Sequence, residues 1–175
     1  GKSLGSVIPL GAQSEVAEVV SRRSVSWLRR YKVPLFVASA TADYRPTDPQ
    51  IAWHLGRFIE QVRAIPVDPI IVRQNWLRAY EFTTDRGAAA LNDYARANDP
   101  FTRVGRQQIA VEVSSVIRAS NDSFRVAWTE RHYENGQLSR TERWTAILTI
   151  VIQTPRDAER LRTNPLGIYV NAISW

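Results

Sequence analysis

Glu130 and His132 are the residues whose types and spacing best suit acid–base chemistry. They lie two positions apart in the alternating stretch 122–133, which is typical of a strand, so their side chains point to the same side as Trp128. A carboxylate and an imidazole at the mouth of a pocket could serve a small-molecule isomerase or hydratase. In the alternative interpretation, Glu130 pairs with Arg140 across a hairpin and His132 lies near an exposed turn, and we favour this alternative.

Other chemical motifs are absent from the sequence. It contains no phosphate-binding glycine loop and no HExxH, GxSxG or CxxC motif. The lack of cysteine excludes disulfides, thiolate metal sites and cysteine nucleophiles. With only two histidines, a histidine-rich metal site is not expected, and we predict neither a metal nor a cofactor. The second histidine, His54, is interpreted as a surface or hydrogen-bonded residue of a helix.

Composition and charge divide the chain into two parts. The 175 residues are 44% hydrophobic and 23% charged, as in an ordinary globular domain, and no apolar run is long enough to span a membrane. Residues 1–40 hold six basic and two acidic groups, whereas residues 41–175 hold 17 basic and 15 acidic groups. We therefore predict a basic, partly helical N-terminal segment, 1–40, and a nearly neutral domain, 41–175. No stable nucleic-acid complex is expected, because a groove for nucleic acid needs clustered basic residues. Contact of the basic segment with single-stranded DNA stays an alternative, which salt-insensitive binding would exclude.

Three helices are predicted in series at the start of the domain. Asp48-Pro49 and Asp68-Pro69 each place a capping residue before a proline, and Thr84 is the expected cap of the third helix. The residues expected to face the core are Ile51, Leu55, Phe58, Ile59 and Val62 on the first helix, and Leu91 and Tyr94 on the third.

After Pro100 the hydrophobic period changes to two, which predicts long antiparallel strands over 107–120, 122–133 and 141–153. The expected apolar faces comprise Ile109, Val111, Val113 and Ile117; Phe124, Val126 and Trp128; and Trp144, Ala146, Leu148, Ile150 and Ile152. The tryptophans expected in the core are Trp53, Trp76, Trp128 and Trp144.

The hairpin between the second and third strands turns at Glu134-Asn135-Gly136. A two-residue turn at Asn135-Gly136 would mix apolar and polar residues on each face of the sheet. A three-residue loop, 134–136, places Val126 opposite Trp144 and keeps the apolar sets together. Because a one-residue slip moves every side chain to the other face, we predict the three-residue loop.

The chain ends with a corner and a last strand, after a short helix over 154–163. In Asn164-Pro165-Leu166-Gly167 the proline fixes one backbone angle and the glycine permits an unusual one. The last strand is apolar on both faces, with Tyr169, Ile173 and Trp175 on one and Ile168, Val170 and Ala172 on the other. Such a strand is central in a sheet or covered by a partner. Together the elements predict an α+β domain, in which a curved antiparallel sheet of about four strands wraps a layer of three helices.

From about residue 42 to residue 175 the chain resembles the TrbF family of conjugal transfer proteins, which belongs with the eighth VirB-type component of bacterial type IV secretion systems. The stretches that carry the resemblance are ADYRPTDPQIAWHL, RFIEQVRAIP, VRQNWLRAYEFTTDRGAAALNDYA, VEVSSVIRAS, TERWTAILTIVIQTPRDAERLR and NPLGIYVNAISW. The signature of the family is an Asn-Pro-any-Gly corner, which residues 164–167 match. Residues 1–40 do not match the family pattern and are expected to be atypical or foreign to the natural gene.

The resemblance implies a nuclear-transport-factor-like cone and a non-enzymatic assembly factor of a conjugative secretion channel. Family members are bitopic inner-membrane proteins with this domain in the periplasm. They self-associate, here expected as a weak homodimer, and they bind other channel subunits. Because no transmembrane helix is present in this sequence, we expect a trimmed, soluble domain. The protein-interaction residues expected on this basis are Asn164, Pro165, Leu166, Gly167 and Tyr169.

Overall fold

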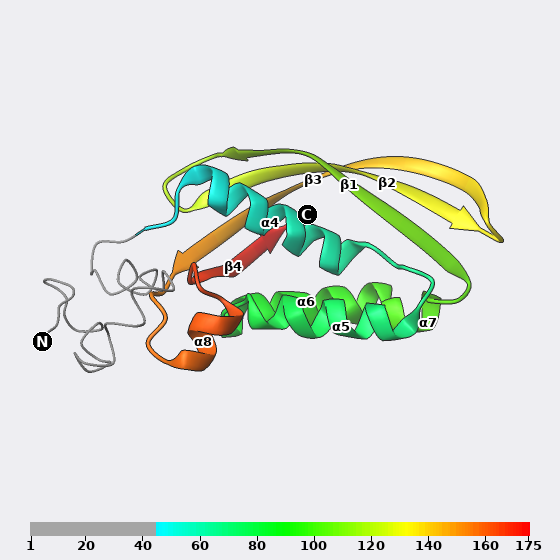
Figure 1. The fold of residues 1–175 in the computed structure, drawn as a ribbon. Helices are drawn as coiled ribbons and strands as arrows, with labels where there is room; N and C mark the ends of the chain where they lie inside the picture. The colour runs from blue at the N-terminus through cyan, green and yellow to red at the C-terminus, as the bar shows by residue number, and fades with distance from the viewer. Residues whose placement is uncertain (1–44) are drawn as a thin grey trace, which may run out of the picture. The chain divides into compact units, whose positions relative to one another are not determined.

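Helices cover one face of a four-stranded antiparallel sheet in residues 45–175, the part of the chain that this computed structural model describes (Figure 1). The elements, in chain order, are α4 (Asp48–Arg63), α5 (Pro69–Glu81), α6 (Asp85–Asn98), α7 (Pro100–Arg103), β1 (Gln107–Arg118), β2 (Ser123–Glu134), β3 (Gln137–Ile152), α8 (Ala158–Thr163) and β4 (Ile168–Ser174). The α+β prediction is confirmed; the sequence did not predict the single turn α7. The predictions for residues 1–40 lie outside the described residues. Within 45–175, no helix has the length and apolar character needed to cross a membrane.

Side-chain caps determine where the three long helices begin. Thr47 caps α4 in a capping box with Gln50, so Asp48 is the first helical residue and the prediction that it is the cap was wrong by one position. The negative charge of Asp48 in the first turn interacts favourably with the helix dipole. Asp68 and Thr84 cap α5 and α6 as predicted.

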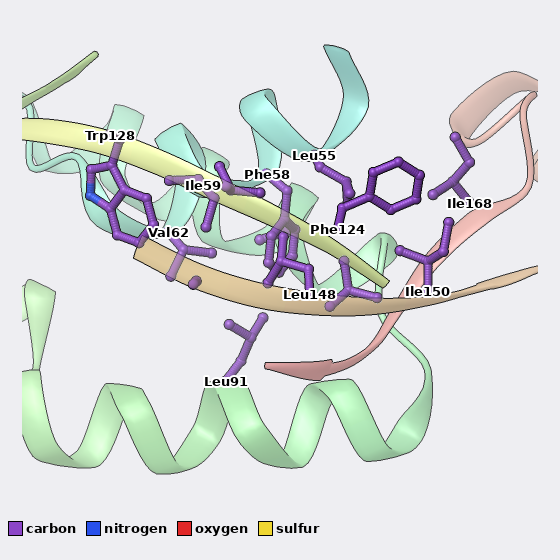
Figure 2. Packing of buried hydrophobic residues seen from close by; sticks show 14 of the residues in the cluster. Leu55, Phe58, Ile59, Val62, Leu91, Phe124, Trp128, Leu148, Ile150 and Ile168 are labelled. Carbon is purple, nitrogen blue, oxygen red and sulfur yellow. The ribbon is translucent and has the colours of Figure 1, made fainter. Parts of the chain in front are cut away.

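The core lies between the sheet and the helices, and the strands follow the order β1-β2-β3-β4 (Figure 2). Leu91 of α6 and Phe58 of α4 are fully buried in this core. The buried side chains labelled in Figure 2 are Leu55, Phe58, Ile59, Val62, Leu91, Phe124, Trp128, Leu148, Ile150 and Ile168. At about 1.5–3 kcal/mol for each large apolar side chain, this burial is the main force that holds the sheet on the helices.

The β2–β3 hairpin has the two-residue turn that the sequence argument rejected. Asn135 and Gly136 have φ values of 53° and 78°, as a primed two-residue turn requires. A bulge at Ser139 then shifts the register, so that Trp128 lies opposite Trp144. The predicted loop and register were wrong. The assignment of faces was still correct, because the bulge adds the one residue that restores the alternation.

A bulge also changes the apolar face of β1. The pairing shifts between Val113 and Ser115, which leaves Ser114 as the extra residue. Val116 therefore packs against the core, whereas Ile117 is 49% exposed. The prediction that Ile117 shares the apolar face was wrong.

The last strand, β4, forms an edge of the sheet, and a bulge at Asn171 shifts its register. Val170 lies opposite Ile150 and Ile173 lies opposite Leu148, so both face the core, and the predicted division into two faces was wrong. The outer side of β4 is not free. The Val170 amide donates to Phe82 O at 2.8 Å, and the Thr84 amide donates to Val170 O at 3.0 Å. The connection between α5 and α6 therefore covers this edge, so β4 is neither central nor dependent on a partner there.

The predicted burial holds for two of the four tryptophans. Trp76 and Trp128 are buried, but Trp53 is 68% exposed and Trp144 is 37% exposed. Trp53 lies on the solvent side of α4 beside Arg57, whose guanidinium carbon is 6.0 Å from the ring centroid. Position 53 lies on the side of α4 opposite Ile51 and Leu55, so the helical period could have indicated the exposure of Trp53.

His54 is buried rather than on the surface, and its Nε2 has no hydrogen-bond partner. Its ring meets Phe82 edge-on, with the centroids 4.5 Å apart. Burial lowers the pKa of His54 from 6.5 to about 4. The interpretation of a surface or hydrogen-bonded histidine was wrong.

Below pH 6.5 the domain is expected to lose stability through His54. The unfolded chain takes up this proton near 6.5, whereas the folded protein takes it up only near 4, so the stability falls as the pH falls through this interval. The loss at the low end is about 3 kcal/mol. Thermal unfolding of the parent and of His54→Leu, from about pH 8 to about pH 4, measures this contribution. Equal pH dependence of the two proteins would contradict it.

Candidate functional site

The corner at 164–167 is a turn that the buried side chain of Asn164 stabilises by hydrogen bonds. Gly167 N donates to Asn164 O at 3.0 Å, with Pro165 as the first central residue. The Asn164 amide Nδ2 donates to Ile168 O at 2.9 Å, and Ile168 N donates to Asn164 Oδ1 at 3.3 Å. Asn164 is only 2% exposed, so its side chain organises the turn and is not itself a contact surface.

Gly167 ties the corner to the end of β3. Its φ is +66°, and its carbonyl accepts from Gln153 N at 2.8 Å. A Cβ at this position would lie 2.1 Å from Gln153 O. Glycine is therefore required both for the backbone angle and for the close approach.

The remaining predicted interaction residues differ in accessibility. Pro165 is exposed, Leu166 is half-buried and packs against the core, and Tyr169 is buried. The exposed part of the corner is thus the Pro165-Leu166 tip, which Asn164 and Gly167 hold in place.

A second candidate site surrounds Arg63, the last residue of α4. Arg63 is 7% exposed, and its Nε donates to Glu130 Oε2 at 2.7 Å. The same carboxylate oxygen accepts from Trp128 Nε1 at 2.9 Å. The predicted pair of Glu130 with Arg140 was wrong, because the register places His132 opposite Arg140 and α4 supplies a different arginine.

Four aromatic rings surround the guanidinium of Arg63. Its central carbon lies 4.3 Å from the centroid of Trp144 and 5.1–5.3 Å from those of Trp175, Tyr94 and Trp128. Such contacts stabilise a cation that has little access to water. Burial raises the pKa of the Tyr94 hydroxyl, so it stays protonated.

His132 and Glu142 complete this cluster. His132 is buried, contrary to the prediction of an exposed turn, and its Nε2 lies 3.3 Å from Glu130 Oε1 and 3.7 Å from Glu142 Oε1. A hydrogen bond from Arg140 holds the pKa of Glu142 below its usual range. The cluster lines a pocket of about 290 Å³.

The pocket that acid–base chemistry requires is therefore present, with Glu130 and His132 in its wall, as the interpretation that we did not favour expects. Glu130 is however held by Arg63 and Trp128, which restrains it as a proton carrier. The sequence argument did not identify Arg63 and Glu142 as part of this site, nor the four aromatic side chains that surround Arg63. Alternation could have indicated Glu142, which precedes Trp144 by two residues on the core-facing side of β3.

The comparisons with known proteins agree with the fold. Residues 29–175 match the family model described as VirB8 protein. The conjugal transfer protein TrbF of Rhizobium radiobacter is 31% identical over 124 residues, which are 69% of this chain and 56% of that protein. This chain thus spans little more than half the length of that relative.

Two solved structures share the fold. The VirB8 protein of Agrobacterium tumefaciens has a TM-score of 0.62 at 12% identity, over 75% of this chain and 94% of that one. A TrwG component of the type IV secretion system of Bartonella birtlesii has a TM-score of 0.57 at 16% identity, over 69% and 85%. The predicted resemblance and the nuclear-transport-factor-like fold are confirmed. The chain therefore belongs to the VirB8 family, whose members are structural components of type IV secretion systems and not enzymes.

Proposed function

We propose that this chain is the periplasmic part of a membrane-anchored secretion subunit, and that it acts by associating with itself and with other subunits of a conjugative channel. Membership of the VirB8 family supports the role in secretion, and the similarity to a conjugal transfer protein supports conjugation as the process. The association is weak for the isolated domain, because an anchor in the membrane normally supplies a high effective concentration.

The observation that carries the proposal is the construction of the corner. Two buried residues, Asn164 and Gly167, fix a tip at which Pro165 is exposed. A rigid, exposed turn loses little conformational entropy when a partner binds it, so it suits a recurrent protein contact. The side chain of Tyr169 is buried, so this residue supports the packing of the strand after the corner rather than the contact itself.

A second surface suits the same role. Trp53 is 68% exposed on α4, and tryptophan is among the residues most enriched at the centres of protein interfaces. The isomerase or hydratase alternative has no comparable support in a family of structural subunits, although the pocket exists. Contact between DNA and residues 1–40 lies outside the described residues.

Substitution at the tip separates association from stability. Asn164→Ala is unsuitable for this purpose, since it leaves both backbone groups of Ile168 without partners and costs about 1–3 kcal/mol. This cost exceeds that of the single hydrogen bond expected from the sequence. Pro165→Glu changes an exposed side chain, so we expect a melting temperature close to that of the parent and self-association at least about tenfold weaker, which corresponds to 1.4 kcal/mol.

Sedimentation velocity over a concentration series measures the effect. Pro49→Glu is the matched control, because Pro49 is also exposed and lies in the first turn of α4, where glutamate is tolerated. We expect this control to associate like the parent. Equal association of Pro165→Glu and the parent would remove the corner from the contact, and a parent that stays monomeric throughout would overturn self-association.

A further inference from the structure

Three side chains at the pocket present ligand atoms at metal-binding distances. His132 Nε2 lies 3.3 Å from Glu130 Oε1 and 3.7 Å from Glu142 Oε1, and each of the three residues has one possible ligand atom within 4.8 Å of those of the other two. Zinc bonds of about 2.0–2.2 Å at tetrahedral angles place neighbouring ligand atoms about 3.3–3.6 Å apart. We propose that Glu130, His132 and Glu142 form a binding site for a divalent cation of the zinc type.

The sheet itself brings these groups together. Glu130 and His132 alternate on β2, and Glu142 lies directly opposite Glu130 on β3. Two carboxylates opposite each other on neighbouring strands repel, and the burial of Glu130 strengthens the repulsion. Arg63 and Arg140 offset part of this repulsion, and a cation between the two carboxylates would remove more of it.

Outer hydrogen bonds orient the two carboxylates. Oε2 of Glu130 accepts from Arg63 Nε and Trp128 Nε1, which leaves its Oε1 towards His132. Oε2 of Glu142 accepts from Arg140 Nε, and its Oε1, which faces His132, also accepts from Trp144 Nε1 at 3.1 Å. Glu130 is thus held as metal ligands commonly are, by partners on the oxygen that does not bind the ion. At Glu142 the ion would share Oε1 with Trp144 Nε1 or displace it.

The pocket gives an ion access to the three ligand residues and leaves one of its coordination positions open. It is about 290 Å³ in volume, and all three ligand residues line it. Three protein ligands with an open side leave a fourth tetrahedral position for water or for a carboxylate from a partner. One imidazole and two carboxylates favour zinc over magnesium or calcium, which prefer larger sets of oxygen ligands.

The nearby arginines limit the affinity. Arg63 and Arg140 already offset the charges of Glu130 and Glu142, so an added dication gains less than it would in an uncompensated acidic site. We therefore expect an exchangeable ion that follows the free zinc concentration, rather than one retained through purification.

Titration calorimetry of the tag-free full chain with Zn²⁺ tests the site. We expect saturable binding of one ion per chain, and a rise of about 5–10 °C in the melting temperature at a hundredfold excess over the dissociation constant. Mg²⁺ should produce neither effect. Co²⁺, which adopts similar coordination, should give the visible absorption of a tetrahedral site.

Variants decide whether these three residues are the ligands. Glu142→Gln keeps the shape of a partly exposed side chain, so it should fold, and we expect at least tenfold weaker zinc binding. His132→Asn should lose the Co²⁺ absorption. Two controls should bind like the parent. Glu112→Gln removes a glutamate of β1 that pairs with Arg131 of β2, and His54→Leu removes the other histidine. The site is disproved by the absence of saturable zinc binding to the parent, or by parental affinity in Glu142→Gln.

Discussion

Gly167→Ala is expected to destabilise the domain by about 3–5 kcal/mol. The added Cβ would lie 2.1 Å from Gln153 O, which is a backbone atom and cannot rotate away. The residue would also keep a φ of +66°, which non-glycine residues adopt only with strain. Urea unfolding of parent and variant gives the difference in free energy directly.

Gly136→Ala is the matched control for this variant. Gly136 has a φ of +78°, but a Cβ there would meet no atom within 4 Å. It therefore isolates the cost of the backbone angle, about 1 kcal/mol, from that of the steric overlap. Equal losses in the two variants would show that the close approach to β3 is relieved by a small movement of the corner.

Arg63→Met is expected to cost about 3–5 kcal/mol, because it leaves the carboxylate of Glu130 buried without its charged partner. Methionine keeps much of the volume and the contacts with the four aromatic rings, so the loss reports chiefly on the charge. Thermal and urea unfolding at neutral pH measure it.

The double variant Arg63→Met with Glu130→Gln provides the control. Removing both charges should restore a large part of the lost stability, since a neutral amide replaces the buried carboxylate and Trp128 Nε1 can still donate to the amide oxygen. Additive losses in the double variant would show that the pair is not coupled, and would assign the effect of Arg63 to packing against the rings.

The sequence predicted the features whose signals are local. The caps Asp68 and Thr84, the periodicity of α4 and α6, and the positive φ that the corner needs at Gly167 all follow from residue types within one or two turns of the chain. The order of helices followed by long alternating strands was sufficient to give the α+β class.

The bulges could not be predicted in the same way. Ser114, Ser139 and Asn171 each add one residue to a strand, and nothing in a period of two marks where such a residue falls. The error in the hairpin shows the consequence: the face pattern was satisfied equally by the predicted loop and by the tighter turn followed by the bulge at Ser139.

The candidate site escaped the sequence argument for a different reason. Arg63 and Glu130 are 67 positions apart, and a pair at that separation forms only because α4 ends against the sheet where β2 carries the glutamate. The burial of Asn164 likewise depends on the backbone of Ile168, to which it bonds on both sides. A motif gives the residues of such a site, whereas tertiary packing decides which of them reach solvent.

The sealed outer side of β4 has a consequence for polymerisation. Open-ended growth by pairing of sheet edges requires that both edge strands of every copy have unpaired backbone groups. At the β4 edge, the backbone groups of Val170 are already bonded to Phe82 and Thr84. At the β1 edge, Ile65 pairs with Ile109. Only the part of β1 beyond Ile109 could therefore pair with a second copy about a two-fold axis, and such a pair would offer no third copy the bonded groups of Val170. Protection of the β4 edge thus disfavours the growth of filaments, while the exposed turns and helices stay free to bind.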